Sequence, residues 1–594
     1  MGDENGNHAL EQGDQGDQDK EFESVDIDDG KGVTLNLGDA PSRVVTDDKC
    51  ELDLDKRASA TSLDEEFGKV DVMHLKTKRP ISLDASVRDK VFFIICRRRH
   101  LAQFFCRDVL YREKKKRKVA DDELFMDLIL VACFAEFGHE LRDSFDGWPS
   151  IEKFFLLFQV VWLVWRTVAF ILNLFPLEQD FAQKATMLGF MIGLISVGLS
   201  AHTSFTTTIP WTSWSAFAVT FFSGLVVFTL GSQSKKIGTK NPLYNTVMLT
   251  GLSSMVFSIP YIISAAVNSP GVARAMFWTS FGVQIGYSFI VPLSLRRFLR
   301  RRRKSLVTPA INIEAFSEKF GLITLITLGE SFISLLFESA LVASPERAGV
   351  IVAVGILGLG IVYSLMTIYF DIDNKIIPGE KHAIRYAAKK GILWSLVHLF
   401  YHACLILGGT GLGQALQASA ESIAKVGKSA RVAVEASVRA EEGGGGDAVV
   451  FDAKWRWLLC AGYGAAILFS TLLSMCHQKG PYSVTKYYRL GARTIIVIAS
   501  LLTSVPLSTS LSPLSVVGIV FAVIATICSV EFFLVQADRL HLWGWIDYEA
   551  LRETHPPGLD EISSVSSGET ASDSLIASMH YSGHALDGEL PKTQ

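Results

Sequence analysis

The chain has 594 residues, of which 49% are hydrophobic and 20% charged, and its formal net charge is -4. Its mean hydropathy of +0.28 is well above what a soluble domain needs, so composition excludes an ordinary soluble protein. Windows of about 20 apolar residues, the length that crosses a bilayer core, recur from residue 124 to residue 536. We therefore predict an all-α, polytopic helical membrane protein.

The amino-terminal part divides by charge into two segments. The first thirty residues contain eleven acidic side chains and one basic side chain, so residues 1–90 are predicted to be a disordered acidic tail. No signal peptide is expected, and the first spanning helix should act as its own insertion signal. Residues 91–119 form a basic juxtamembrane segment, in which Phe92 to Arg99 favours a short interfacial helix on an anionic leaflet.

Twelve later segments are predicted to cross the membrane, nine in a core over 120–413 and three over 455–540. Between them, 414–454 is an Ala- and Gly-rich loop with a helical look, expected on the non-cytoplasmic side. Residues 541–594 are predicted to be a mostly disordered tail. The predicted spans are 124–142, 153–174, 185–202, 213–231, 243–267, 275–295, 320–343, 347–370, 391–413, 455–476, 492–509 and 514–536.

Loop charge predicts the orientation of these spans, because cytoplasmic loops are enriched in Lys and Arg. Alternate loops are basic, whereas 203–212 and 510–513 contain neither residue. Twelve spans with both termini in the cytoplasm satisfy this pattern. The plasma membrane and internal membranes fit equally well. The basic loops are 112–118, 232–242, 296–304, 371–390 and 477–491.

The first span carries ionisable residues in apolar surroundings. Such groups cost roughly 2.5 kcal/mol or more at the bilayer centre, so they persist where they pair or line a wet path. Glu136 and His139 share one helix face, and Asp127 falls nearly opposite at ~100° per residue. Glu140 lies near the outer boundary and is expected to be solvated. The first span should therefore pack against other helices on two sides.

The second span contains Arg166. It runs antiparallel to the first, and at ~1.5 Å per residue Arg166 and Glu136 lie within about 6 Å of the same depth. An ion pair between them is geometrically allowed. It could serve helix packing or function.

The seventh span, 320–343, places Thr327, Glu330, Ser331 and Ser334 on one face. A carboxylate surrounded by hydroxyl groups can coordinate a cation or pass a proton. The alternative is a protonated Glu that is hydrogen-bonded within the bundle.

The ninth span contains His398 and His402, one helical turn apart. Such a pair can supply two zinc ligands, but no further ligand is evident, so a hydrogen-bonded or proton-relay role is favoured. Asp371, at the cytoplasmic end of the eighth span, is expected to be solvated. We expect no bound metal and no cofactor.

The first and seventh spans align with an offset of 194 positions, which places Glu136 on Glu330 and Leu128 on Leu322. The two spans are six places apart in the order of spans, an even number, so the two halves would share one orientation. This pattern predicts a parallel repeat of six plus six helices, as in transporters with a site between repeats. The hypothesis is that Glu136 and Glu330 are paired positions of one site.

Four short stretches together resemble the low temperature requirement A (LtrA) family. They are Glu123-Leu-Phe-Met-Asp127, Leu328-Gly-Glu-Ser331, Tyr369-Phe-Asp371 and His402-x-x-Leu405-x-x-Gly408. The resemblance implies a multi-pass membrane protein, and the family name records a growth phenotype and supplies no substrate. Cys404 replaces the Pro that the family usually has two residues after the His. The acidic tails and the 414–454 insertion are typical of a fungal-type member.

These features favour a solute or proton-coupled transporter with buried carboxylates at the midplane. The alternatives are a cation channel and a non-transporting membrane scaffold or stress-response protein. Phe125-Met-Asp127 is also similar to the first helix of an endolysosomal potassium-channel family, which keeps the channel open as an alternative. Enzymatic activity is not expected, because no nucleophile elbow, metal triad or nucleotide loop is present.

The expected partners are the lipid bilayer and an unknown small solute or ion. The basic run Lys114 to Lys118 would suit a nucleic acid, but in a chain with this many spans it is better explained as a topology signal, so no nucleic-acid partner is expected. A further possible partner is a second copy of the chain, in a homo-oligomer.

Overall fold

The computed structural model describes thirteen stretches of the chain, all within one compact unit, Leu54–Gln594. The predicted interfacial helix at 92–99, most of the acidic tail and the tail after 540 lie outside the described residues. The described stretches are 58–60, 72–75, 102–106, 109–113, 121–175, 181–234, 242–301, 307–342, 348–373, 381–437, 451–478, 486–508 and 510–539.

Long helices make up most of the structure. The first group is α3 (Asp121–Asp143), α4 (Trp148–Leu174), α5 (Phe181–Leu199), α6 (Ile209–Ser234), α7 (Pro242–Phe257), α8 (Ile259–Val267) and α9 (Pro270–Arg301). The second group is α10 (Ile313–Val342), α11 (Ala348–Thr367), α12 (Ala383–Tyr386), α13 (Ala388–Ser437), α14 (Ala453–Cys476), α15 (Lys486–Ala499), α16 (Val505–Leu507) and α17 (Pro513–Arg539). Two π-helical turns, η3 (Ile368–Asp373) and η4 (Ser500–Ser504), continue α11 and α15.

Ten helical segments in the described part of the chain are long and apolar enough to cross a membrane. This confirms a polytopic helical membrane protein. The two other predicted spans, α3 and α9, are helical but fall outside that set, and α3 carries Asp127, Glu136 and Glu140 within its apolar stretch. Twelve spans, their orientation and the six-plus-six repeat therefore stay predictions.

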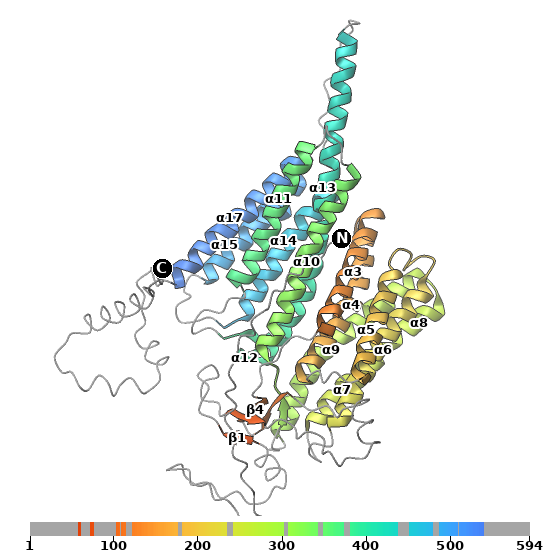
Figure 1. Ribbon diagram of the computed structural model, residues 1–594, viewed down its shortest axis with the longest axis vertical. Helices are drawn as coiled ribbons and strands as arrows, with labels where there is room; N and C mark the ends of the chain where they lie inside the picture. Colours follow the sequence, from red (N-terminus) through yellow and green to blue (C-terminus); the bar gives the residue numbers. More distant parts are fainter. Residues whose placement is uncertain are drawn as a thin grey trace, which may run out of the picture. The chain divides into compact units, whose positions relative to one another are not determined.

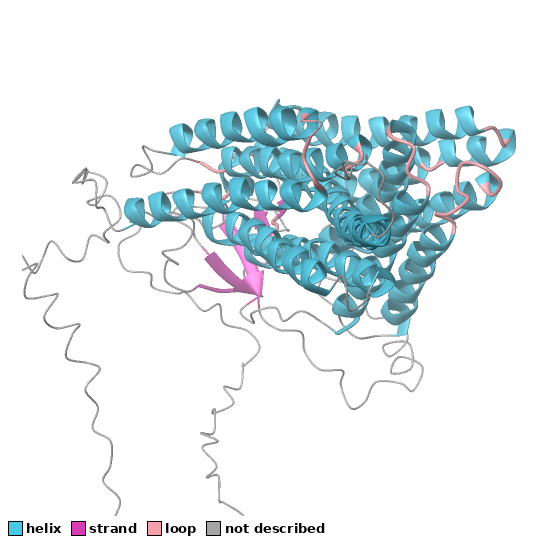
Figure 2. Cartoon of the chain, turned by 90° about the horizontal axis from the view of Figure 1, so that it is seen from above, coloured by secondary structure: helices cyan, strands magenta, loops and turns pink. Residues whose placement is uncertain are grey.

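The helices pack as two neighbouring groups with α3 and α4 at their junction (Figure 1). α3 contacts α5 on one side and α10 and α13 on the other. Within the second group α13 is central, because it contacts α10, α11, α14 and α17. Seen from above, the helices surround the long α13, and the strands form one small sheet (Figure 2).

The small sheet was not predicted from the sequence. It has five strands in the order β1-β2-β4-β3-β5, namely β1 (Ala58–Ala60), β2 (Val72–Leu75), β3 (Gln103–Cys106), β4 (Val109–Glu113) and β5 (Val307–Pro309). β3 pairs antiparallel with both β4 and β5. The sheet therefore joins the segment before α3 to the segment before α10. Part of the predicted acidic tail and of the basic segment is β-structure.

α13 is longer than the ninth predicted span. It continues to Ser437, so residues 414–437 are helical where a loop was predicted. Ala is the strongest helix former, and this stretch contains no Pro, which explains the continuation. Figure 1 shows α13 extending beyond the other helices.

Glycine residues bring α13 and α14 into close contact. A Cβ atom on Gly462 would lie 2.4 Å from the backbone nitrogen of Gly408, and one on Gly411 would lie 2.6 Å from that of Leu459. Small residues at such positions let membrane helices approach closely. The Gly-rich stretch 408–413 is therefore a packing surface.

This packing predicts that Gly462→Ala destabilises the protein by about 1–3 kcal/mol, because the added methyl group meets the backbone of α13. Gly518→Ala is the matched control, since no atom lies within 4 Å of its added Cβ and Ala favours the helix. Thermal unfolding of detergent-purified protein measures both. Equal unfolding temperatures for the two variants would contradict the close approach of α13 and α14.

Candidate functional site

Asp127 lies in a buried ion cluster between α3, α4 and α10. Lys319 Nζ is 2.9 Å from Asp127 Oδ2 and 3.1 Å from Glu123 Oε2. The indole Nε1–H of Trp165 donates to Asp127 Oδ1 at 2.9 Å. The sequence pointed to Asp127 but missed its partners. The spacing of Glu123 and Asp127, one turn apart, was the available signal.

Glu330 lies at the junction of α3, α10 and α13, and its side chain is buried. A Cβ atom on Gly138 would be 3.9 Å from Glu330 Oε1, 3.6 Å from Thr410 Oγ1 and 3.8 Å from Ile406, so Gly138 of α3 lies directly beside the carboxylate and the α13 side chains. Glu330 Oε2 is enclosed and receives no hydrogen bond from the described residues.

The hydroxyl groups of α10 do not surround Glu330 as hydrogen-bond donors. Thr327 Oγ1 donates to the carbonyl oxygens of Ile323 and Thr324, at 3.0 and 2.9 Å. Ser331 Oγ donates to Leu405 O at 3.4 Å, and Ser334 is buried on the same helix. Short hydroxyl side chains in helices commonly bond the preceding turn in this way, and the predicted hydroxyl shell is corrected accordingly.

His402 is buried with both ring nitrogens occupied. The indole Nε1–H of Trp162 donates to His402 Nδ1 at 3.1 Å, so Nδ1 carries no proton. His402 Nε2 therefore bears the hydrogen and donates to Thr324 Oγ1 at 2.9 Å. The hydroxyl group of Thr324 in turn donates a hydrogen bond to Phe320 O.

His398 has the opposite tautomer. Its Nδ1–H donates to Trp394 O at 2.7 Å, and Tyr369 O–H donates to its Nε2 at 2.9 Å. The rings of His398 and His402 have centroids 5.6 Å apart. The two histidine rings are thus neighbours, each held by its own hydrogen bonds, and no group of three or more potential metal ligands occurs among the described residues.

Glu136 is exposed on α3, so its expected pairing with Glu330 is wrong. It shares an outward-facing stripe with Leu124, Leu128 and Ala132, each four residues apart. Asp127 and Gly138 are on the buried side of α3, and their burial shows how the helix is turned about its own axis. The helix is apolar on nearly every face, so periodicity could not fix which face was buried.

The predicted pair of Glu136 with Arg166 is also wrong. The guanidinium of Arg166 lies over the Trp162 ring at 5.9 Å, and it makes no ion pair with a described residue. Arg142 Nη2 donates to His139 Nδ1 at 2.7 Å, and the His139 ring packs against Phe337 of α10 at 4.9 Å. His139 therefore joins α3 to α10.

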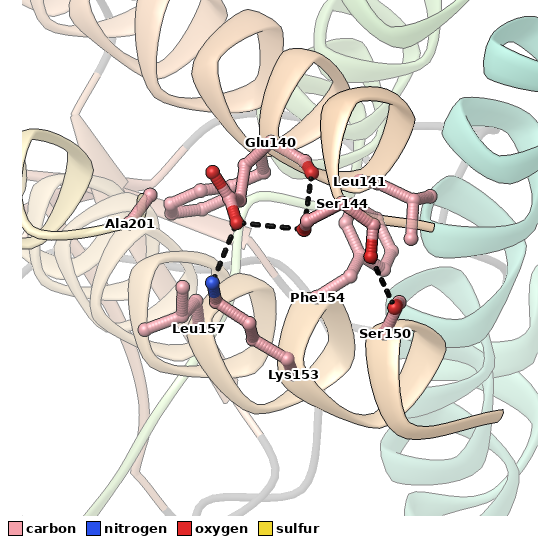
Figure 3. Close-up of a pocket in the computed structure, with 9 residues that line it drawn as sticks. Glu140, Leu141, Ser144, Ser150, Lys153, Phe154, Leu157 and Ala201 are labelled. Carbon is pink, nitrogen blue, oxygen red and sulfur yellow. Dashed lines mark hydrogen bonds and ion pairs between the residues drawn. The ribbon is translucent and has the colours of Figure 1, made fainter. Parts of the chain in front are cut away.

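Glu140 is buried, with 6% of its surface exposed, where a solvated helix end was expected. It accepts from Lys153 Nζ at 2.6 Å, from Ser144 Oγ at 2.8 Å and from His202 Nδ1. Figure 3 shows the carboxylate, Lys153 and Ser144 converging in a small pocket beside Ser150. Ser144 of the α3–α4 connection and Lys153 of α4 therefore help to enclose this carboxylate.

A second ion network, also missed from the sequence, joins η3, α15 and α17. Arg493 donates to both oxygens of Asp373, at 2.9 and 3.0 Å, and its Nε is 3.1 Å from Glu531 Oε1. Arg489 Nη1 donates to Glu531 Oε2 at 3.0 Å, and Ser470 Oγ donates to Asp373. The predicted boundary residue, Asp371, is half-buried on the same π-helical turn as Asp373, where a solvated side chain was expected.

Six carboxylates are buried in the described part of the chain, and five have a cation partner. Lys319, Lys153, Arg493 or Arg489 lies within 3.1 Å of each of these five. Glu330 is the exception, since no Lys or Arg of the described residues forms an ion pair with it. The paired carboxylates are Glu123, Asp127, Glu140, Asp373 and Glu531.

The fold and these buried charges define a multi-pass helical membrane protein. The profile of the family described as "Bacterial low temperature requirement A protein (LtrA)" matches residues 118–529, more than half of the chain. The chain therefore belongs to the LtrA family, which confirms the resemblance seen in the Leu328 to Ser331 stretch. No curated protein and no solved structure matches the chain.

The Lys319 cluster predicts that Lys319→Met destabilises the protein by about 3–5 kcal/mol, because two carboxylates lose their buried counter-ion. Adding Asp127→Asn and Glu123→Gln should recover part of the loss. Lys184→Met is the control, since Lys184 pairs with Asp122 but is 54% exposed, where ion pairs contribute little. Unfolding temperatures measure all three. A loss equal to that of the Lys184 variant would show that Lys319 is not the counter-ion.

Proposed function

We propose that this protein is a proton-coupled secondary transporter of a small solute or ion, in which Glu330 carries the proton. The observation that carries this proposal is that Glu330 alone, among the six buried carboxylates of the described residues, forms no ion pair; the charge of Arg142 acts on it only from beyond ion-pair distance. An isolated charge is costly in an apolar interior, whereas the protonated form is not charged. Gain and loss of a proton at this position would therefore change the energy of the surrounding helix packing strongly.

The position of Glu330 supports a coupling role. It touches the junction of α3, α10 and α13, so its protonation state acts on three helices together. α3 and α10 are the two helices that would begin the proposed six-helix repeats, and sites in repeat-built transporters lie between repeats. A small rearrangement of this junction would alter access to Glu330 from either side of the membrane.

The column of polar side chains along α10 and α13 supports a path for protons. Thr324, His402 and His398 are buried one after another along the two helices. His402 is hydrogen-bonded to Thr324 on one side of its ring and to Trp162 on the other. An imidazole can take a proton on one nitrogen and release one from the other. In the proposed mechanism, this column connects the Glu330 region with the ends of α10 and α13 where both helices begin.

The transporter proposal is distinguished from the alternatives by what moves and how fast. A cation channel would give unitary currents in patch-clamp recordings of reconstituted protein, whereas a carrier would not. A scaffold would give neither current nor flux.

The cytoplasmic position of both termini is part of the same proposal, and it rests on the charge of the loops.

Glu330→Gln should reduce pH-dependent flux at least tenfold, since Gln keeps the shape but carries no exchangeable acidic proton. Vesicles with reconstituted protein and a trapped pH dye are given a pH gradient and candidate solutes one at a time. Glu136→Gln is the matched control, because Glu136 is exposed on the same part of the bundle and should retain flux. Unchanged flux in a folded Glu330→Gln variant would remove Glu330 from the mechanism.

A further inference from the structure

Three aromatic side chains cluster where α12 and α13 begin and α14 ends. His382, Trp394 and His477 are 6%, 0% and 4% exposed. The ring centroid of His382 lies 4.8 Å from that of Trp394 and 4.8 Å from that of His477, and the remaining pair is 6.5 Å apart. The three rings therefore form one compact, buried group that is separate from Glu330.

Each ring presents a hydrogen-bond donor without an acceptor. His382 Nδ1 accepts from the backbone N–H of Ile384 at 3.3 Å, and His477 Nδ1 accepts from that of Ala383 at 3.1 Å. In a neutral imidazole the other nitrogen then bears the hydrogen, so both Nε2 atoms are donors. These two atoms and Trp394 Nε1 are buried and find no partner among the described residues.

The surroundings of the cluster are positive. Burial and then Arg385 lower the pKa of His382 to about 4. Burial, followed by His382 and Lys486, lowers the pKa of His477 to about 2, with smaller effects of His398 and Lys390. Both rings are therefore neutral at physiological pH. The charged side chains of described residues that act on them, from α12, α13 and α15, are all cations.

We propose that the three N–H donors of His382, Trp394 and His477 bind a small inorganic anion of about the size of chloride. An unsatisfied buried donor is destabilising, and one acceptor shared between three donors removes the deficit. The positive surroundings favour an anion over a water molecule as that acceptor. The rings are almost inaccessible, which excludes large anions. Because the donors come from the beginning of α13 and the end of α14, the bound anion stabilises the contact between these helices.

Chloride should raise the thermal unfolding temperature of the detergent-purified full chain in a saturable way, since it binds only the folded state. The measurement replaces sodium gluconate by sodium chloride at constant ionic strength and neutral pH. The wild-type protein should gain a few degrees and then reach a plateau. No difference between the two salts would overturn the proposal and leave water as the acceptor.

Three variants separate this site from general salt effects. His477→Asn keeps an acceptor for the Ala383 N–H but removes the Nε2 donor, and Trp394→Phe keeps a ring but removes the Nε1 donor. Both should lose most of the chloride-dependent shift. His477→Gln retains a donor near the Nε2 position and should keep more of the shift than His477→Asn. If Trp394→Phe and His477→Asn both retain the full shift, chloride binds elsewhere and the proposal is wrong.

Discussion

The structure depends on the requirement that a carboxylate buried in the helix bundle has a cation partner, which five of the six buried carboxylates of the described residues meet. Lys319 joins α3 to α10, Lys153 joins α4 to the end of α3, and Arg493 joins α15 to η3 and α17. Breaking such a buried pair costs several kcal/mol, because it leaves an uncompensated charge. The ion clusters therefore hold particular helix ends together, while the Gly-mediated contact of α13 with α14 holds the centre.

Glu330 departs from this requirement, and the departure is informative because its neighbours obey it. α10 carries both Lys319, which pairs with two carboxylates, and Glu330, which forms no ion pair with a described residue and lies beside Gly138 of α3. Both ring nitrogens of His398 and of His402 have hydrogen-bond partners, and none of these partners is Glu330. A buried acid in this setting is stable when neutral, and it can respond to a proton without the rearrangement of an ion network.

The sequence predicted the helices of the membrane core well, because apolar length is a strong signal. It also identified Asp127, Glu330, His398 and His402 as buried polar groups. It missed Glu123, Lys319 and Arg489 because charges near the ends of an apolar run look like boundaries, whereas α3, α10 and α15 begin earlier than predicted. The face of Glu136 was wrong because α3 is apolar on almost all sides, and Glu531 was overlooked within its span. The sheet could not be predicted, since β3 and β5 are about 200 residues apart in the chain and their pairing is a tertiary contact.

The most direct test of the account is infrared spectroscopy of the reconstituted protein, which detects the carbonyl stretch of a protonated carboxylic acid. A protonated Glu330 gives such a band in the wild-type protein at neutral pH, and the band should be lost when the pH is raised and be absent from the Glu330→Gln variant. A spectrum without this band, or one in which the band persists unchanged in Glu330→Gln, would contradict the claim that Glu330 carries the exchangeable proton.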